Sequence, residues 1–178
     1  MAISLNPLPT VSFQTSHGNF TIEIDTDHVP ATVNTFLTYV TDGFYDNTLI
    51  HRVIDNFIIQ GGGFEPGMIQ KTTRPSIPNE AEHGLRNERG TIAMARLPDD
   101  PNSATSQFFI NTRDNDLLNH GGQVQPGYCA FGRVIEGMEV VERIEGVVTH
   151  TVGDHQYVPL QEIIVHRIIL HEPPIEPE

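Results

Sequence analysis

The chain has 178 residues and a mass of 19.8 kDa, which fits a single domain and leaves little room for two. Its 23 acidic and 10 basic residues give a formal net charge of −13, which argues against nucleic acid or an anionic membrane surface as the main partner. The only cysteine, Cys129, excludes an intrachain disulfide and a Cys-x-x-Cys redox or zinc site.

The two ends of the chain differ in character from its middle. No stretch approaches the roughly 20 apolar residues of a membrane-spanning helix. Residues 1–9 carry no Lys or Arg and are interrupted by Pro7 and Pro9, which is atypical of a signal peptide. We therefore expect the cytoplasm, with the periplasm as second choice if the chain is a trimmed mature form. We interpret residues 1–10 as an N-terminal extension, 11–171 as the folded domain and 172–178 as an acidic, proline-rich tail.

Alternating apolar and polar residues predict β-strands along most of the chain. Phe20, Ile22 and Ile24 alternate with polar residues after a turn signal at 16–19, which indicates a hairpin. The same reasoning predicts further strands at 49–54, 57–60, 91–95, 107–111, 128–134 and 163–170.

Two segments keep the helical period instead. Between Pro30 and Gly43, apolar residues recur at positions 33, 36, 37 and 40, and a shorter stripe from Met138 ends at Gly146. About eight short strands, two helices and one long irregular stretch at 61–90 predict a mainly β fold, a closed antiparallel barrel capped by two helices, because closure removes exposed sheet edges.

Motifs for several other chemistries are incomplete. Gly61–Gly63 is followed by no Lys-Ser or Lys-Thr, so we interpret it as a bend and not as a phosphate loop. The nine histidines lack metal-binding spacing, and no Gly-x-Ser-x-Gly nucleophile motif occurs. Cys129 lies in a predicted strand, where an inert small apolar residue is the expectation. We predict no metal site.

Three stretches combine a guanidinium, aromatic rings and amides. Residues 50–64 contain Arg52, Phe57 and Gln60 on two neighbouring strand segments, and residues 91–96 and 106–111 supply small, apolar and amide side chains. By pattern alone, these stretches are equally compatible with an ordinary barrel core in which a surface acid satisfies the arginine.

The runs His51-Arg-Val-Ile54, Ile59-Gln-Gly-Gly62 and Ser106-Gln-Phe-Phe109 closely resemble the cyclophilin family of peptidyl-prolyl cis-trans isomerases, particularly its bacterial branch. The resemblance extends from about Val11 to Leu170. It implies an eight-stranded antiparallel barrel capped by two helices, which agrees with the elements predicted above, and chemistry that requires no cofactor.

The resemblance also implies roles for individual residues. Arg52 would donate a hydrogen bond to the prolyl nitrogen, Phe57 would help to grip the proline ring and Gln60 would contact the substrate backbone; these three form the catalytic set. The substrate-binding set completes the proline socket, supports Gln60 and lines the groove for residues preceding the proline. It comprises Ile58, Ala95, Arg96, Gln107, Phe109, Leu117, Leu118 and Tyr128. At the Arg96 position the family makes its contact largely through the main chain.

Three of these residues depart from well-studied eukaryotic members. Ile58 replaces Met, Leu117 replaces Trp and Tyr128 replaces His. We expect activity to survive all three changes. Binding of cyclosporin, which in the family depends on that Trp, is expected to be weak.

The sequence therefore predicts a monomeric peptidyl-prolyl cis-trans isomerase that accelerates rotation about X-Pro bonds in unfolded or flexible protein segments and assists folding. Its expected partners are proline-containing peptides and unfolded proteins, with no nucleic acid and no membrane. Two alternatives stay open: a proline-peptide binding module without turnover, and an acidic metal-binding protein.

Overall fold

The computed structural model describes residues 7–173. Most of the predicted extension (1–10) and tail (172–178) therefore lies outside the described residues. Among the described residues, no helix is both long and apolar enough to cross a membrane.

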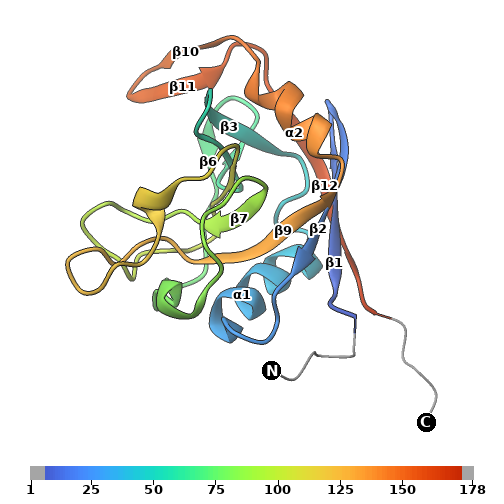
Figure 1. Ribbon diagram of the computed structural model, residues 1–178. Helices are drawn as coiled ribbons and strands as arrows, with labels where there is room; N and C mark the ends of the chain where they lie inside the picture. The colour runs from blue at the N-terminus through green and yellow to red at the C-terminus, as the bar shows by residue number, and fades with distance from the viewer. Residues whose placement is uncertain (1–6, 174–178) are drawn as a thin grey trace.

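Eight strands close into an antiparallel barrel (Figure 1). In spatial order they are β1 (Thr10–Thr15), β12 (Ile164–His171), β3 (Thr48–Ile54), β4 (Ile58–Gly61), β8 (Phe108–Asn111), β7 (Thr91–Met94), β9 (Ala130–Glu136) and β2 (Gly18–Ile24). The predicted fold class, a closed eight-stranded barrel with two helices, is confirmed.

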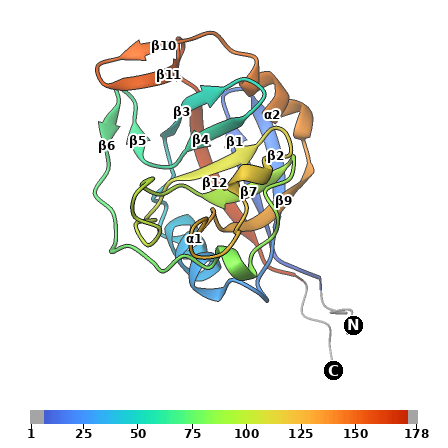
Figure 2. The same cartoon turned by 60° about the vertical axis from the view of Figure 1, so that its left-hand side comes forward.

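The two helices lie at opposite ends of the barrel (Figures 1 and 2). Helix α1 (Pro30–Thr41) begins with proline and buries the predicted stripe, including Val33, Phe36 and Val40, against the barrel. Helix α2 (Met138–Glu145) buries Val140, Val141 and Ile144. Apolar residues at helical spacing therefore cover the barrel ends, as their period predicts.

The N-terminus of α1 is capped by a distant residue. Val29, which precedes the helix, makes no side-chain cap. Instead, the Glu80 carboxylate accepts hydrogen bonds from the Thr32 backbone N–H at 2.6 Å and from the Thr32 hydroxyl at 2.7 Å. A carboxylate is well suited to this place because the first turn of a helix leaves N–H groups unpaired and carries partial positive charge.

Aromatic rings fill the barrel interior. Phe13 and Phe20 lie opposite each other in the β1–β2 register and stack with ring centroids 4.6 Å apart. Phe36 from α1 and Phe108 from β8 pack edge to face at 6.1 Å. Aromatic pairs such as these stabilise the packing beyond the area they bury, and the Phe13–Phe20 pair does so across two strands.

Two small sheets outside the barrel were not predicted. Strands β5 (Phe64–Glu65) and β6 (Ile69–Gln70) lie within the irregular stretch, which also contains the short 3₁₀ helix η1 (Ala81–His83). Strands β10 (Thr149–Val152) and β11 (His155–Pro159) form a hairpin that projects from the barrel (Figure 2). Most of the hairpin residues are polar and exposed, so they give no strand-like apolar alternation.

Candidate active site

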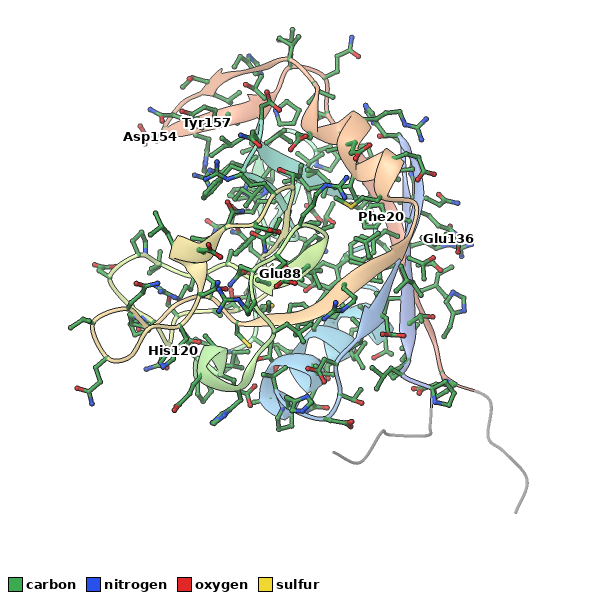
Figure 3. The ribbon with its side chains drawn as sticks, viewed as in Figure 1. Phe20, Glu88, His120, Glu136, Asp154 and Tyr157 are labelled. Atoms are coloured by element: carbon green, nitrogen blue, oxygen red, sulfur yellow. The ribbon has the colours of Figure 1, made fainter. Side chains whose placement is uncertain are left out.

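An open cavity of about 470 Å³ lies on the outer face of β3, β4 and β8 and beside the segment that follows β7. The β10–β11 hairpin, marked by Asp154 and Tyr157, and the loop that carries His120 project from the same side of the molecule (Figure 3). Residues from the hairpin and from the segments around that loop line the cavity. The complete lining is His51, Arg52, Phe57, Ile58, Gln60, Phe64, Ala95, Arg96, Pro98, Gln107, Phe109, Leu118, Tyr128 and His155.

A chain of hydrogen bonds orients the cationic residue of the cavity. Arg52 on β3 lies opposite Gln60 on β4, and its Nη1 donates to Gln60 Oε1 at 3.0 Å. Gln60 Nε2 then donates to Gln107 Oε1 at 2.9 Å. No ion pair in the described part of the chain includes Arg52. A surface acid therefore does not satisfy this guanidinium, which keeps its charge and further N–H groups for a ligand.

Beside Arg52 lies an apolar cluster separate from the barrel interior. Successive residues of β4 and β8 point to opposite faces, so Ile59 and Ile110 enter the barrel core whereas Ile58 and Phe109 face outward. The outward cluster contains Ile58, Ala93, Phe109 and Ala130, with Phe57, Leu85, Ala95, Leu118 and Tyr128 packed against it. This arrangement forms a shallow apolar socket that a small aliphatic ring could enter.

Buried asparagines hold the loops that form the socket. Asn115 Nδ2 donates to the Phe57 carbonyl at 3.0 Å and to Asn111 Oδ1 at 2.8 Å. Asn87 Nδ2 donates to the carbonyls of Leu118 and Tyr128, both at 3.1 Å. Sequence reasoning missed these asparagines, and no spacing in the sequence marks them, because they lie in β8 and in loops.

The end of the cavity near the hairpin consists of rings that sequence reasoning also missed. His51 packs on Phe64 with centroids 4.5 Å apart, and Phe64 meets His155 at 5.1 Å. Burial lowers the pKa of His51 to about 3, and the nearby His155 and Arg52 act in the same direction. The His51 imidazole is therefore neutral at pH 7, which leaves Arg52 as the fixed positive charge at this point of the cavity.

The structure brings together ten of the eleven residues predicted for the site. Leu117 is the exception: it does not line the cavity, and 87% of its surface is exposed. Leu117 and Leu118 are consecutive in the 3₁₀ helix η2 (Asp116–Leu118), where neighbouring side chains point about 120° apart. Leu118 faces the socket and Leu117 faces solvent.

The described residues provide neither a metal-binding cluster nor a reactive cysteine. No group of three or more His, Cys, Asp or Glu residues within 7–173 could hold a metal ion. Cys129 is buried, and burial raises the pKa of its thiol to about 11. The arrangement in the cavity, a cationic donor beside an apolar socket, suits binding and polarisation of a small apolar group that carries an acceptor.

Comparison with known proteins assigns the chain and its fold to one family. The family described as cyclophilin type peptidyl-prolyl cis-trans isomerase/CLD matches residues 10–169. Peptidyl-prolyl cis-trans isomerase B of Escherichia coli (strain K12) is 52% identical over 164 residues, which cover 91% of this chain and 99% of that protein. Peptidyl-prolyl cis-trans isomerase cyp18 of Streptomyces antibioticus is 50% identical, with 89% and 96% covered.

A solved structure supports the same assignment. The cyclophilin type peptidyl-prolyl cis-trans isomerase of Cryptosporidium parvum, crystallised in the presence of the dipeptide Ala-Pro, superposes with a TM-score of 0.78. It is 30% identical in sequence, and the match covers 92% of this chain and 99% of that one.

Proposed function

Because this chain belongs to the cyclophilin-type peptidyl-prolyl cis-trans isomerase family and is an isomerase of that class, we propose that Arg52 drives the reaction by donating a hydrogen bond to the prolyl nitrogen of an X-Pro bond. The observation that carries this proposal is the place of Arg52. Its guanidinium has an amide partner and no carboxylate partner among the described residues, and it borders an apolar socket.

The chemistry of the bond explains why such a donor helps. Rotation about a peptide bond breaks its resonance and must cross a barrier of about 18–20 kcal/mol. At the top of the barrier the prolyl nitrogen is pyramidal and carries a lone pair, which accepts a hydrogen bond better than the planar nitrogen does. A donor aimed at that nitrogen therefore stabilises the transition state more than either planar isomer.

Arginine suits this role better than lysine. Its guanidinium stays protonated in a partly buried site, whereas desolvation could neutralise an ammonium group. Gln60 supports the role by accepting one N–H from Arg52, which leaves other N–H groups for the substrate.

The donor alone is too weak for efficient catalysis. The uncatalysed rotation takes tens to hundreds of seconds. Completing it in milliseconds requires a rate constant about five powers of ten larger, which means a barrier lower by roughly 7 kcal/mol. One preorganised donor contributes about 2.7–4 kcal/mol. We assign the remainder to preferential binding of the twisted amide: Phe57, Ile58, Phe109 and Leu118 hold the ring, and Gln60 holds the substrate backbone.

The same geometry supports a proposal about substrates. The socket is small and apolar, whereas the rest of the cavity is open. We expect selectivity for proline itself and little for its neighbours, which suits exposed X-Pro bonds in unfolded or flexible chains and a role in assisting folding.

The test is cis/trans exchange of an Ala-Pro-Phe peptide measured by NMR. We expect strong acceleration by the native protein and a loss of about two to three powers of ten in Arg52→Ala, the magnitude of one preorganised donor. Arg86→Ala is the matched control, because Arg86 pairs with Asp116 on the surface and does not line the cavity.

The alternative function, a proline-peptide binding module, gives a different result. A binding module would shift the peptide resonances without accelerating exchange. Equal acceleration by native protein and Arg52→Ala would instead retain the isomerase and remove Arg52 as its donor.

A further inference from the structure

Arg96 is the second guanidinium of the cavity, and its side chain folds back onto the loops that form the cavity wall. Its Nε and Nη2 donate to one carbonyl oxygen, that of Gly127, at 3.0 and 2.9 Å. Its Nη1 donates to the carbonyls of Leu97 at 2.9 Å and of Pro98 at 3.4 Å. The bonds to Gly127 join the segment that follows β7 to the segment that precedes β9, and the bonds to Leu97 and Pro98 fix the turn of the first segment.

The same guanidinium lies over the ring of Tyr128. The Arg96 Cζ is 4.2 Å from the ring centroid, within the range of a cation–π contact. The Tyr128 ring in turn meets the ring of Phe109 edge to face, with centroids 5.6 Å apart and planes at 76°. Both rings belong to the apolar cluster that forms the socket.

The carbonyl that Arg96 binds is itself firmly held. Gly127 has a φ of +74°, and a Cβ at this position would lie 2.4 Å from the backbone nitrogen of His120, so only glycine fits. The Gly127 carbonyl also accepts a hydrogen bond of 3.0 Å from Asn79 Nδ2. The Gly127 carbonyl therefore joins Arg96 to Asn79 through hydrogen bonds from both side chains.

We propose that the Arg96 side chain is a positioning residue of the isomerase, which holds the Tyr128 ring against Phe109 and so sets the wall of the proline socket. This inference rests on the proposed function. It differs from the family resemblance, which attributes the contact at this position largely to the main chain. The side chain acts on the substrate only through Tyr128.

A kinetic consequence follows from where the contact acts. Tyr128 is not among the residues assigned above to preferential binding of the twisted amide, and its ring would meet the proline ring equally in the planar isomers and in the transition state. Loosening the wall therefore removes uniform binding, which raises KM and leaves kcat nearly unchanged.

The experiment compares Arg96→Ala, Arg96→Lys and the surface control Arg86→Ala in the exchange assay. We expect Arg96→Ala to raise KM about three- to tenfold, with kcat within about twofold of native. Arg96→Lys should lie between Arg96→Ala and the native protein, because lysine keeps a charge over the ring and loses the paired bonds to Gly127. Arg86→Ala should match native values.

A double-substitution cycle with Tyr128→Leu identifies the route of the effect. If Arg96 acts through the Tyr128 ring, Arg96→Ala should change KM less than about twofold once that ring is gone. In addition, the Tyr128 ring resonances should shift in Arg96→Ala and not in Arg86→Ala.

Three results would overturn the inference: an unchanged KM in folded Arg96→Ala, full additivity with Tyr128→Leu, or unmoved Tyr128 resonances. If Arg96→Ala does not fold, Arg96→Lys is judged by the same criteria. Failure of the proposed function would look different. Arg52→Ala would then accelerate exchange as strongly as the native protein does, while the KM values of the Arg96 variants would still report the effect of Arg96 on the socket.

Discussion

Arg52 and Gln60 lie opposite each other across β3 and β4, and a hydrogen bond of 3.0 Å joins the guanidinium to the amide oxygen. The amide nitrogen of Gln60 is used in turn by Gln107, at 2.9 Å. A neutral acceptor orients the guanidinium without cancelling its charge. The choice of an amide over a carboxylate at position 60 therefore preserves the donor that the proposed mechanism needs.

Replacing Gln60 by glutamate should test this relationship directly. Gln60→Glu keeps the shape of the side chain but gives Arg52 an ion-pair partner, so kcat/KM should fall about ten- to a hundredfold. The exchange assay measures it, with Gln70→Glu on β6, outside the cavity, as the charge-matched control. Unchanged kcat/KM in Gln60→Glu would show that the charge of Arg52 is not required.

The asparagine network should contribute to stability. Asn115→Ala removes the donor to Asn111 Oδ1 and one of the two donors to the Phe57 carbonyl, which keeps its bond from the Thr112 N–H. Leaving the buried Asn111 oxygen unpaired should lower the free energy of unfolding by about 1–3 kcal/mol. Urea denaturation provides the measurement. Asn34→Ala, on the exposed face of α1, should change it by less than about 0.5 kcal/mol. Equal effects of the two substitutions would contradict a structural role for the network.

The buried His51 should make stability depend on pH. Its pKa in the folded protein is lowered from 6.5 to about 3, so between these values the unfolded chain binds the proton and the folded chain does not. The contribution of His51 to the free energy of unfolding is therefore fully present above pH 6.5. It declines as the pH falls toward 3, by up to about 1.4 kcal/mol per pH unit.

Urea denaturation at pH 4.5 and 7.5 measures that decline. His51→Leu should lose less stability than the native protein between the two pH values. His166→Asn, an exposed change on β12, should behave like the native protein. If His51→Leu and the native protein decline equally, other groups account for the acid sensitivity.

Leu117 gives a prediction about inhibitors. Family members that bind cyclosporin tightly use a tryptophan at this position, whereas Leu117 is exposed and does not line the cavity. The native protein should bind cyclosporin weakly, and Leu117→Trp should strengthen binding about tenfold or more, since an aromatic ring adds a large contact area. Inhibition titrations measure both. Tight inhibition of the native protein would refute the prediction.

Much of the fold could be predicted because the barrel follows simple periods. The alternation of Phe20, Ile22 and Ile24 and the helical spacing of Val33, Phe36 and Val40 all correspond to buried positions. The β10–β11 hairpin was not predicted, because most of its residues are exposed and show no apolar alternation. Its strands are held by pairing between backbones, which side-chain periodicity does not report.

In the candidate site, too, residues within recognisable motifs could be predicted, whereas contacts that depend on the folded loops could not. Arg52, Gln60 and Phe109 lie on strands within recognisable motifs, so the resemblance placed them together. The roles of Asn87 and Asn115 depend on which loop carbonyls lie within reach, and that is known only once the loops are folded. The direction of Leu117 likewise depends on the local 3₁₀ geometry, and sequence spacing alone does not supply it.

The apolar cluster outside the barrel has a wider consequence. Strands β4, β7 and β8 carry apolar side chains on both faces, so the wall that seals the barrel core also forms the floor of the socket. A bound proline ring would be packed as one more side chain of the protein, against atoms that folding has already immobilised. Binding of the ring to that floor then requires no ordering of a loop.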